Sequence, residues 1–382
     1  MAENLNIHGG AGQVPVPFGD TPQSRRWFLR KAGVITAASI AGPALLPGLL
    51  AACSTTSTTK SPSTKVSAAP TSVALLSPQS SGGDPPVLDM IAAMDTVGKK
   101  HGARTRYVFV SDPSNYTSTL DLLAESYDIV VTAFPEMGTP IAAAAKAHPK
   151  TRFIWIFGTP FNPPIPNVVT VSYKFYEGMY FAGILAAFVT TTNKIGYIGG
   201  AAAPELNEDY YAYAAGAHSI NPAISVSGAF VGSYTDPNGG QQVADSMYGS
   251  GVDVIQTDAS ATDLGVLKAA EADKLYMSYD SDPTAYKQAP SLILGSAILE
   301  FGVSLTLELE SAFAPTWSAG GTAVAQGLAD KVTGYAPSPV FATSAPAAVG
   351  AKFKAGLSKM QAAQAAVAAG TLTIPVNTSA IP

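Results

Sequence analysis

Features that catalysis and metal binding require are scarce in this chain. Its 382 residues include one cysteine and four histidines, and charged residues make up 13% of the total. A single cysteine excludes an intramolecular disulfide, and no histidine is spaced with a carboxylate or a thiol as a metal site requires. The sequence also lacks a G-x-G-x-x-G pattern, a P-loop and a G-x-S-x-G motif. We therefore expect no metal, no cofactor, no catalytic residue and no enzyme activity.

Positive charge and long apolar runs are scarce as well. The net charge is −5, and no basic cluster lies outside the N-terminal segment, so nucleic-acid binding has little support. After that segment, no apolar run is long enough to cross a membrane.

Residues 1–52 have the pattern of an export signal with a lipobox. Residues 24–31 read SRRWFLRK, which resembles the twin-arginine motif, and an alanine-rich apolar stretch follows over residues 32–50. The sequence LAAC at residues 50–53 resembles a bacterial lipobox, in which cleavage leaves a cysteine whose thiol carries diacylglycerol. A transmembrane anchor is the alternative, although glycines and prolines weaken that helix. Cys53 is therefore the expected lipidation site.

The rest of the chain divides into a tether and two expected lobes. Residues 53–70 are rich in Ser, Thr, Pro, Ala and Lys, which is typical of a flexible tether. The remaining residues exceed the usual size of a single hydrophobic core, so we expect two lobes. We assign residues 71–192 and 296–321 to lobe 1, and residues 193–295 and 322–382 to lobe 2.

Short β-branched runs alternate with helical segments from residue 72 onward. Strands separated by helices of about 10–15 residues predict right-handed crossovers and parallel sheets. A junction between two such runs lies at residues 168–200, where a helix over residues 176–190 carries small residues at helical spacing, among them Gly178, Ala182 and Gly183. This stripe predicts a close approach to another backbone. The predicted fold class is α/β, with two doubly wound parallel-sheet lobes.

Ligands of open α/β sheets bind beyond the carboxyl ends of the strands. The loops at those ends mix aromatic rings with carboxylates, which suits a ring-bearing ligand with hydroxyl groups. Other roles stay open, because Asp280 and Asp282 could be turn residues, Asp258 could cap a helix and Phe134 could close a core. The expected ligand-binding residues are Asp84, Asp112 and Phe134 in lobe 1, and Tyr210, Asp258, Asp280 and Asp282 in lobe 2.

Several short motifs together resemble one family. The helix carries Glu177-Gly178 and then AGILAA at residues 182–187, and the next strand reads KIGYIGG at residues 194–200. Later landmarks are NP at residues 221–222, GSYTDP at residues 232–237, GVDVI at residues 251–255 and DSD at residues 280–282. This pattern resembles the basic membrane protein family of substrate-binding lipoproteins, in particular the purine nucleoside receptor type.

The resemblance implies a fold, a function and some residue roles. It implies two lobes of the type I periplasmic-binding-protein kind, hinged by crossovers, with the terminal helix returning to lobe 2. It implies a ribose-hydroxyl contact at Asp280 or Asp282 and a loop near the base at residues 258–260. The chain departs from the family in the loop at residues 82–86. The stacking phenylalanine that the family has after Gly200 and Pro204 is missing as well, and Asn207, Glu208 and Asp209 stand near its place.

The function implied is that of a lipid-anchored receptor on the extracytoplasmic face of the cell membrane. It would capture a nucleoside-like solute and present it to an ABC permease. One alternative is a sensory lipoprotein that binds the same solute without transport. Another is an exported enzyme acting on nucleosides, since twin-arginine export takes folded and often cofactor-loaded proteins.

Overall fold

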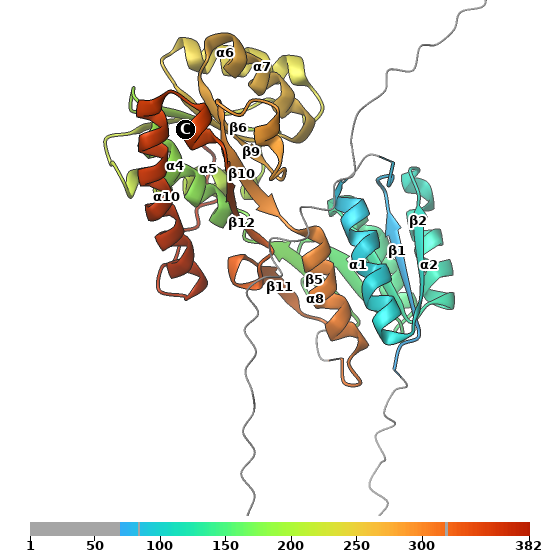
Figure 1. The fold of residues 1–382 in the computed structure, drawn as a ribbon. Coiled ribbons are helices and arrows are strands. Elements are labelled where there is room, and N and C mark those ends of the chain that lie inside the picture. The colour runs from blue at the N-terminus through green and yellow to red at the C-terminus, as the bar shows by residue number, and fades with distance from the viewer. Residues whose placement is uncertain (1–68, 83–84, 318–319) are drawn as a thin grey trace, which may run out of the picture. The chain divides into compact units, whose positions relative to one another are not determined.

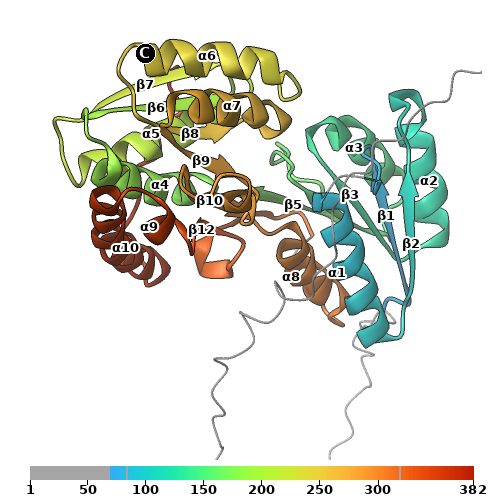
Figure 2. The same ribbon diagram turned by 45° about the horizontal axis from the view of Figure 1, so that its top comes forward.

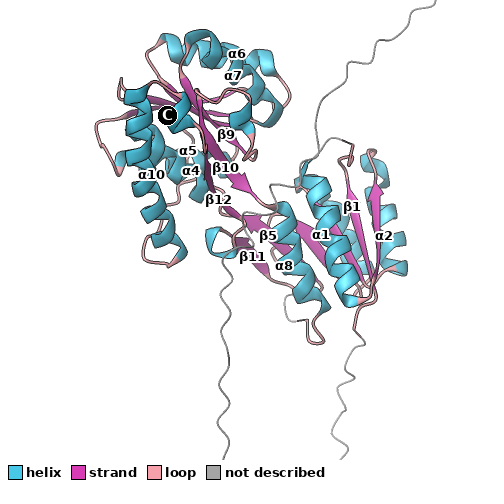
Figure 3. Cartoon of the chain, in the orientation of Figure 1, coloured by secondary structure: helices cyan, strands magenta, loops and turns pink. Residues whose placement is uncertain are grey.

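The computed structural model describes residues 69–82, 85–317 and 320–382. The expected export signal, Cys53, nearly all of the tether and Asp84 lie outside these residues. The described residues form two six-stranded sheets with helices on them (Figures 1 and 3). None of the helices in these residues has the length and apolar character needed to cross a membrane.

The first sheet is entirely parallel. In spatial order it contains β11 (Ala323–Gln326), β5 (Val168–Tyr173), β4 (Arg152–Ile156), β3 (Ile129–Ala133), β1 (Ser72–Ser77) and β2 (Arg104–Phe109). Its helices are α1 (Pro85–His101), α2 (Tyr116–Ser126), α3 (Gly138–Ala147) and α8 (Phe301–Phe313). Alternate residues of β1 serve the two faces, because Leu75 lies in the core with α1 and α8 while Leu76 lies in the core with α2 and α3.

The second sheet repeats this strand order. It contains β12 (Thr333–Pro337), β10 (Ile293–Leu299), β9 (Tyr276–Asp280), β8 (Val254–Asp258), β6 (Lys194–Gly199) and β7 (Ser225–Phe230). All pairs are parallel except β10 with β12. One face carries α4 (Tyr176–Val189), α5 (Pro204–His218), α9 (Phe341–Ser344) and α10 (Ala347–Ala368), and the other carries α6 (Pro237–Gly249) and α7 (Asp263–Asp273), which Figure 2 shows side by side.

Five single-turn 3-10 helices lie between these elements. They are η3 (Pro113–Asn115), η4 (Pro135–Met137), η5 (Ser260–Thr262), η6 (Ala285–Lys287) and η7 (Leu328–Asp330). The architecture confirms the predicted α/β fold class, with two sheets that are each covered by helices on both faces.

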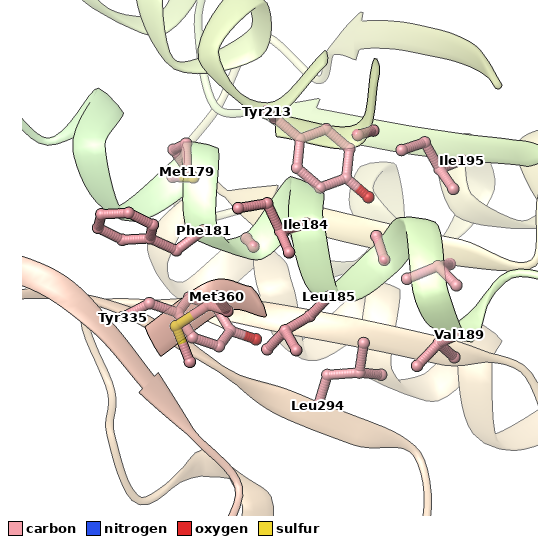
Figure 4. Packing of buried hydrophobic residues seen from close by; sticks show 14 of the residues in the cluster. Met179, Phe181, Ile184, Leu185, Val189, Ile195, Tyr213, Leu294, Tyr335 and Met360 are labelled. Carbon is pink, nitrogen blue, oxygen red and sulfur yellow. The ribbon is translucent and has the colours of Figure 1, made fainter. Parts of the chain in front are cut away.

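Helix α4 lies in the core of the second sheet (Figure 4). The small-residue stripe brings it against α5, because a Cβ atom at Gly183 would overlap the carbonyl oxygen of Tyr213. A Cβ atom at Gly216 of α5 would in turn overlap the carbonyl oxygen of Tyr180. This confirms the close helix approach predicted from the sequence.

The chain passes between the two sheets three times. It leaves the first sheet after β5, since the next helix, α4, contacts α5, α10 and β12 of the second sheet's layers. The boundary between the lobes, expected at residue 192, therefore lies at residues 174–175. It returns between β10 and α8, and leaves again between β11 and β12. Since β11 pairs with β5, residues 323–326 belong to the first sheet and not to the second.

Buried Glu177 links two of these passages. Its Oε2 accepts hydrogen bonds from the backbone N–H of Leu328 at 2.6 Å and from the Thr333 hydroxyl at 3.2 Å. A Cβ atom at Gly178 would overlap the carbonyl oxygen of Gly334. The Glu-Gly pair therefore holds the start of α4 against the segment that joins β11 to β12.

Candidate functional site

Two phenylalanines follow neighbouring strands of the first sheet in a strained backbone conformation. Phe134 follows β3 with φ 77°, and Phe157 follows β4 with φ 58°. Such residues cost about 1–3 kcal/mol each and cluster at ligand sites. Phe134 is 7% exposed, whereas Phe157 is 39% exposed. Both rings lie 6.2 Å from the ring of Phe301, and Phe157 lies 5.7 Å from that of Tyr173.

Trp155 holds the backbone of Phe134 in place. Its indole N–H donates a 2.8 Å hydrogen bond to the carbonyl oxygen of Phe134. Glycines give the indole room, because a Cβ atom at Gly158 would overlap the ring and one at Gly138 would lie 2.7 Å from it. The backbone at Phe134 is therefore held in place by the buried indole of Trp155.

The corresponding end of the second sheet carries a cluster of carboxyl groups. Asp258 ends β8 and Asp280 ends β9, while Asp209 comes from α5 and Asp263 begins α7. Asp258 is 9% exposed, Asp209 is 4% exposed and Asp263 is 0% exposed, and Asp280 is partly buried. The side chains of Asp209 and Asp258 are hydrogen-bonded to each other, as are those of Asp263 and Asp280. We call these four residues the acidic cluster.

Neutral donors orient the cluster. The Tyr197 hydroxyl donates to Asp258 Oδ2 at 2.9 Å, and the Thr257 hydroxyl donates to Asp263 Oδ2 at 2.6 Å. The backbone N–H of Ser260 donates to Asp280. Ser260 has φ 55° and Ser281 has φ 51°, so the loops after β8 and β9 are strained as well.

Burial makes the carboxyl groups of the cluster weaker acids than usual. It raises the pKa of Asp258 to about 7, with repulsion from Asp280 adding to the effect. Burial also raises the pKa of Asp209 and of Asp263 well above the usual range, and that of Asp280 in the same direction. Two carboxyl groups in a hydrogen bond share a proton, because each ionised group only accepts.

We expect Asp258→Asn to stabilise the fold at alkaline pH. The pKa of Asp258 is about 7 in the folded protein against a reference of 3.8. The folded state therefore binds more protons between those values, and stability is lost as the pH rises through 7. Asparagine keeps the contacts and does not titrate, so the gain at pH 8 should be on the order of 2 kcal/mol.

Urea unfolding at pH 5 and pH 8 measures this effect. Asp112→Asn is the control, since this exposed carboxylate has its pKa lowered by hydrogen bonds from Ser114 and should show no gain at pH 8. A lower stability of Asp258→Asn at pH 8 would contradict the proton sharing.

The structure brings together two of the residues predicted from the sequence, Asp258 and Asp280. Asp112 and Asp282 cap turns, since each accepts from the backbone N–H and the hydroxyl of the residue two positions later. Phe134 packs in the core, which was the alternative left open for it. The predicted binding roles of these residues stay predictions.

Tyr210 lies apart from the acidic cluster. Its hydroxyl donates to the carbonyl oxygen of Val226 at 3.1 Å, and its ring packs 5.9 Å from that of Tyr197. It lines a cavity of about 410 Å³ together with Tyr211, His218 and Pro375. Its neighbour in sequence, Asp209, is the residue that reaches Asp258.

Five residues that the structure places at these strand ends are not among the ligand-binding residues expected from the sequence. They are Phe157, Tyr197, Asp209, Asp263 and Tyr279. Phe157 could have been selected, because it directly follows the apolar, strand-like run FIWI at residues 153–156. Asp263 begins α7 and Asp209 lies in the second turn of α5, and only the folded arrangement brings them to the strand ends.

Known proteins share both the sequence pattern and the fold. The profile of the family described as "ABC transporter substrate-binding protein PnrA-like" matches residues 72–349. Basic membrane protein A2 of Borrelia garinii subsp. bavariensis is 28% identical over 234 residues, which cover 60% of this chain and 69% of that protein. The ABC transporter nucleoside-binding protein BmpA of Lactococcus lactis subsp. cremoris is 32% identical over 174 residues, or 45% of this chain and 49% of that protein.

A solved structure shares the arrangement of both sheets. A solute-binding protein of an ABC transporter system from Aeropyrum pernix K1 superposes with a TM-score of 0.62 at 19% identity, covering 81% of this chain and 94% of that one. At this identity the likeness shows the fold alone. The family match spans most of the chain and confirms the resemblance seen in the motifs, so the chain belongs to the PnrA-like family of ABC transporter substrate-binding proteins.

Proposed function

We propose that this chain captures a small ring-bearing solute, a purine nucleoside or a related compound, between its two lobes and presents it to an ABC permease. The observation that carries the proposal is the pairing of chemistries at the strand ends, with aromatic rings on the first sheet and carboxyl groups on the second. The Lactococcus relative is named for nucleoside binding, which supports this class of ligand.

Each strand end would contribute a different contact. The exposed ring of Phe157 would stack on a planar ring of the solute. Asp280 would accept hydroxyl protons, since hydrogen bonds to a charged group are worth about 1.5–3 kcal/mol. A solute that touches both lobes favours their closed arrangement by its differential contacts.

Export and anchoring belong to the same proposal. Cys53 would carry the lipid that holds the protein on the extracytoplasmic face of the membrane, with residues 54–70 as tether. Palmitate labelling of cells expressing the full chain should modify the natural sequence and not Cys53→Ser. Equal labelling of both would contradict this site of lipidation.

A thermal-shift screen tests the function directly. The panel should hold nucleosides, nucleobases, flavins and sugars, and a ligand at 100 times its Kd should add about 2.7 kcal/mol to stability. Recovery of the bound compound unchanged favours a receptor, whereas its conversion would favour an enzyme. Loss of solute uptake on deletion of the chain favours transport, and unchanged uptake would favour the sensory alternative.

We expect Phe157→Leu to weaken binding of a ring-bearing solute by about 5- to 150-fold, because stacking on an aromatic ring is worth about 1–3 kcal/mol. Binding of sugars should change less. Calorimetry on the best ligand of the screen measures the effect. Phe313→Leu is the control. Phe157 packs near Phe301 at the start of α8, whereas Phe313 lies at the end of that helix and stacks on His101. Equal losses in both variants would argue against a direct contact at Phe157.

A further inference from the structure

We propose that the captured solute carries a positive charge, such as a protonated amine or a cationic ring nitrogen, which the acidic cluster neutralises. This inference rests on the proposed function and names the ligand class of that site. It follows from the charge around the cluster, from a buried hydroxyl without a partner and from the aromatic rings nearby.

The surroundings of the acidic cluster are negative throughout. The charged groups that act most strongly on its four carboxyls are other cluster members, together with Glu205, Glu208 and Asp282. Within the described part of the chain, no Lys, Arg or His forms an ion pair with the cluster. One proton in each carboxyl pair leaves one negative charge, and buried charge without a counter-ion is costly.

The counter-charge is better supplied by an organic cation than by a metal ion. The described residues contain no group of three or more acidic, histidine or cysteine side chains arranged to hold a metal. An ammonium or amidinium group needs only one or two carboxylates, because its N–H donors make charge-assisted hydrogen bonds. The cluster offers such acceptors as separate pairs on β8 and β9.

Tyr279, which directly precedes Asp280 on β9, also carries a polar group that lacks a partner. Its hydroxyl is buried in a side chain that is 5% exposed, and it has no hydrogen-bond partner. The charges that act most strongly on it are Asp263, Asp280 and Asp282. A ligand rich in N–H groups supplies donors to acceptors that the protein leaves unsatisfied.

Exposed aromatic rings fit the same ligand. The ring of Tyr234 is 42% exposed and lies against Gly200, and Asp258 and Asp280 are the charges that act most strongly on its hydroxyl. On the first sheet, the ring of Phe157 is 39% exposed. Aromatic faces attract cations within about 6 Å, so carboxylates and rings together favour a cationic ring compound over a neutral one.

Matched compounds that differ in charge test this inference. 1-Methyladenosine is cationic at neutral pH, whereas its isomer N6-methyladenosine is neutral, and glucosamine with glucose and tyramine with 4-(2-hydroxyethyl)phenol form similar pairs. In at least one pair, calorimetry at pH 7.5 should show about 10-fold tighter binding of the cation. That preference should shrink at about 0.5 M salt and be lost in Asp280→Asn, while Asp245→Asn, which changes an exposed carboxylate on α6, retains it.

The outcomes separate this inference from the proposed function. Binding of neutral members as tight as or tighter than their cationic partners would overturn the inference and leave the receptor function standing. Binding of no compound in the panel would overturn both. Unfolding curves of each variant show whether it is folded, and Asp258→Asn provides a second cluster variant whose preference for the cation should also fall.

Discussion

Asp280→Asn is expected to weaken solute binding by roughly 10- to 150-fold while the protein stays folded. Asp280 ends β9, is partly buried and accepts a hydrogen bond from the backbone N–H of Ser260. A carboxylate in this position can accept two hydroxyl or N–H protons with charge assistance, which an amide cannot match. Calorimetry with the best ligand of the screen measures the loss.

Asp282→Asn is the matched control for this prediction. From the sequence, both carboxylates were expected to bind the solute. In the structure, Asp282 Oδ1 accepts from the backbone N–H and the hydroxyl of Thr284 at 2.8 and 2.9 Å. We therefore expect Asp282→Asn to change affinity less than about 3-fold. Unchanged affinity in both variants would place the site elsewhere.

The second large effect concerns stability. Gly183→Ala is expected to destabilise the fold by on the order of 3 kcal/mol, because the added Cβ atom would overlap the carbonyl oxygen of Tyr213 and push α4 away from α5. Two rigid helix backbones cannot yield as a flexible side chain would. Urea unfolding of the purified variant gives the free-energy difference.

Gly249→Ala provides the comparison. Gly249 ends α6, and a Cβ atom there would meet no atom within 4 Å. Alanine has the higher helix propensity, so this variant should gain stability slightly or not change. A similar loss of stability in both variants would mean that the small residues of α4 are not needed for its close contact with α5.

Most of the fold could be predicted from local sequence patterns. The alternation of strands and helices and the small-residue stripe of α4 depend on spacing along the chain, and the structure confirms both. Strand β12 lacks a clear sequence signal, because Gly334 and Pro337 lower its strand propensity. It is tolerated as an antiparallel strand at the edge of the sheet, where proline need not donate.

The extent of β10 was also misjudged. The apolar run typical of a strand ends at residue 294, but the strand continues to Leu299 through Gly295 and Ser296, with a shift of register against β9. Glycine and serine interrupt the β-branched pattern on which the prediction relied. The passage back to the first sheet accordingly follows Leu299.

The site was only partly predictable. Strand ends indicated Asp258 and Asp280, since position along a strand is readable from sequence. The contacts of these residues with Asp209 and Asp263 were not readable, because like charges are expected to avoid each other and the pairing arises from helices that meet the strand ends. A local signal existed for the turns, as Asp112 and Asp282 each stand in an Asp-Pro-Ser/Thr sequence.

Hydrogen exchange with and without the best ligand of the screen tests the central claim most directly. If the solute binds at the carboxyl ends of both sheets, ligand should slow exchange at residues 133–137 and 157–158, and at residues 258–263 and 280–284. The cavity beside Tyr210 on α5 should be unaffected. Slower exchange confined to α5 and residues 375–378, with no change at the strand ends, would contradict the account.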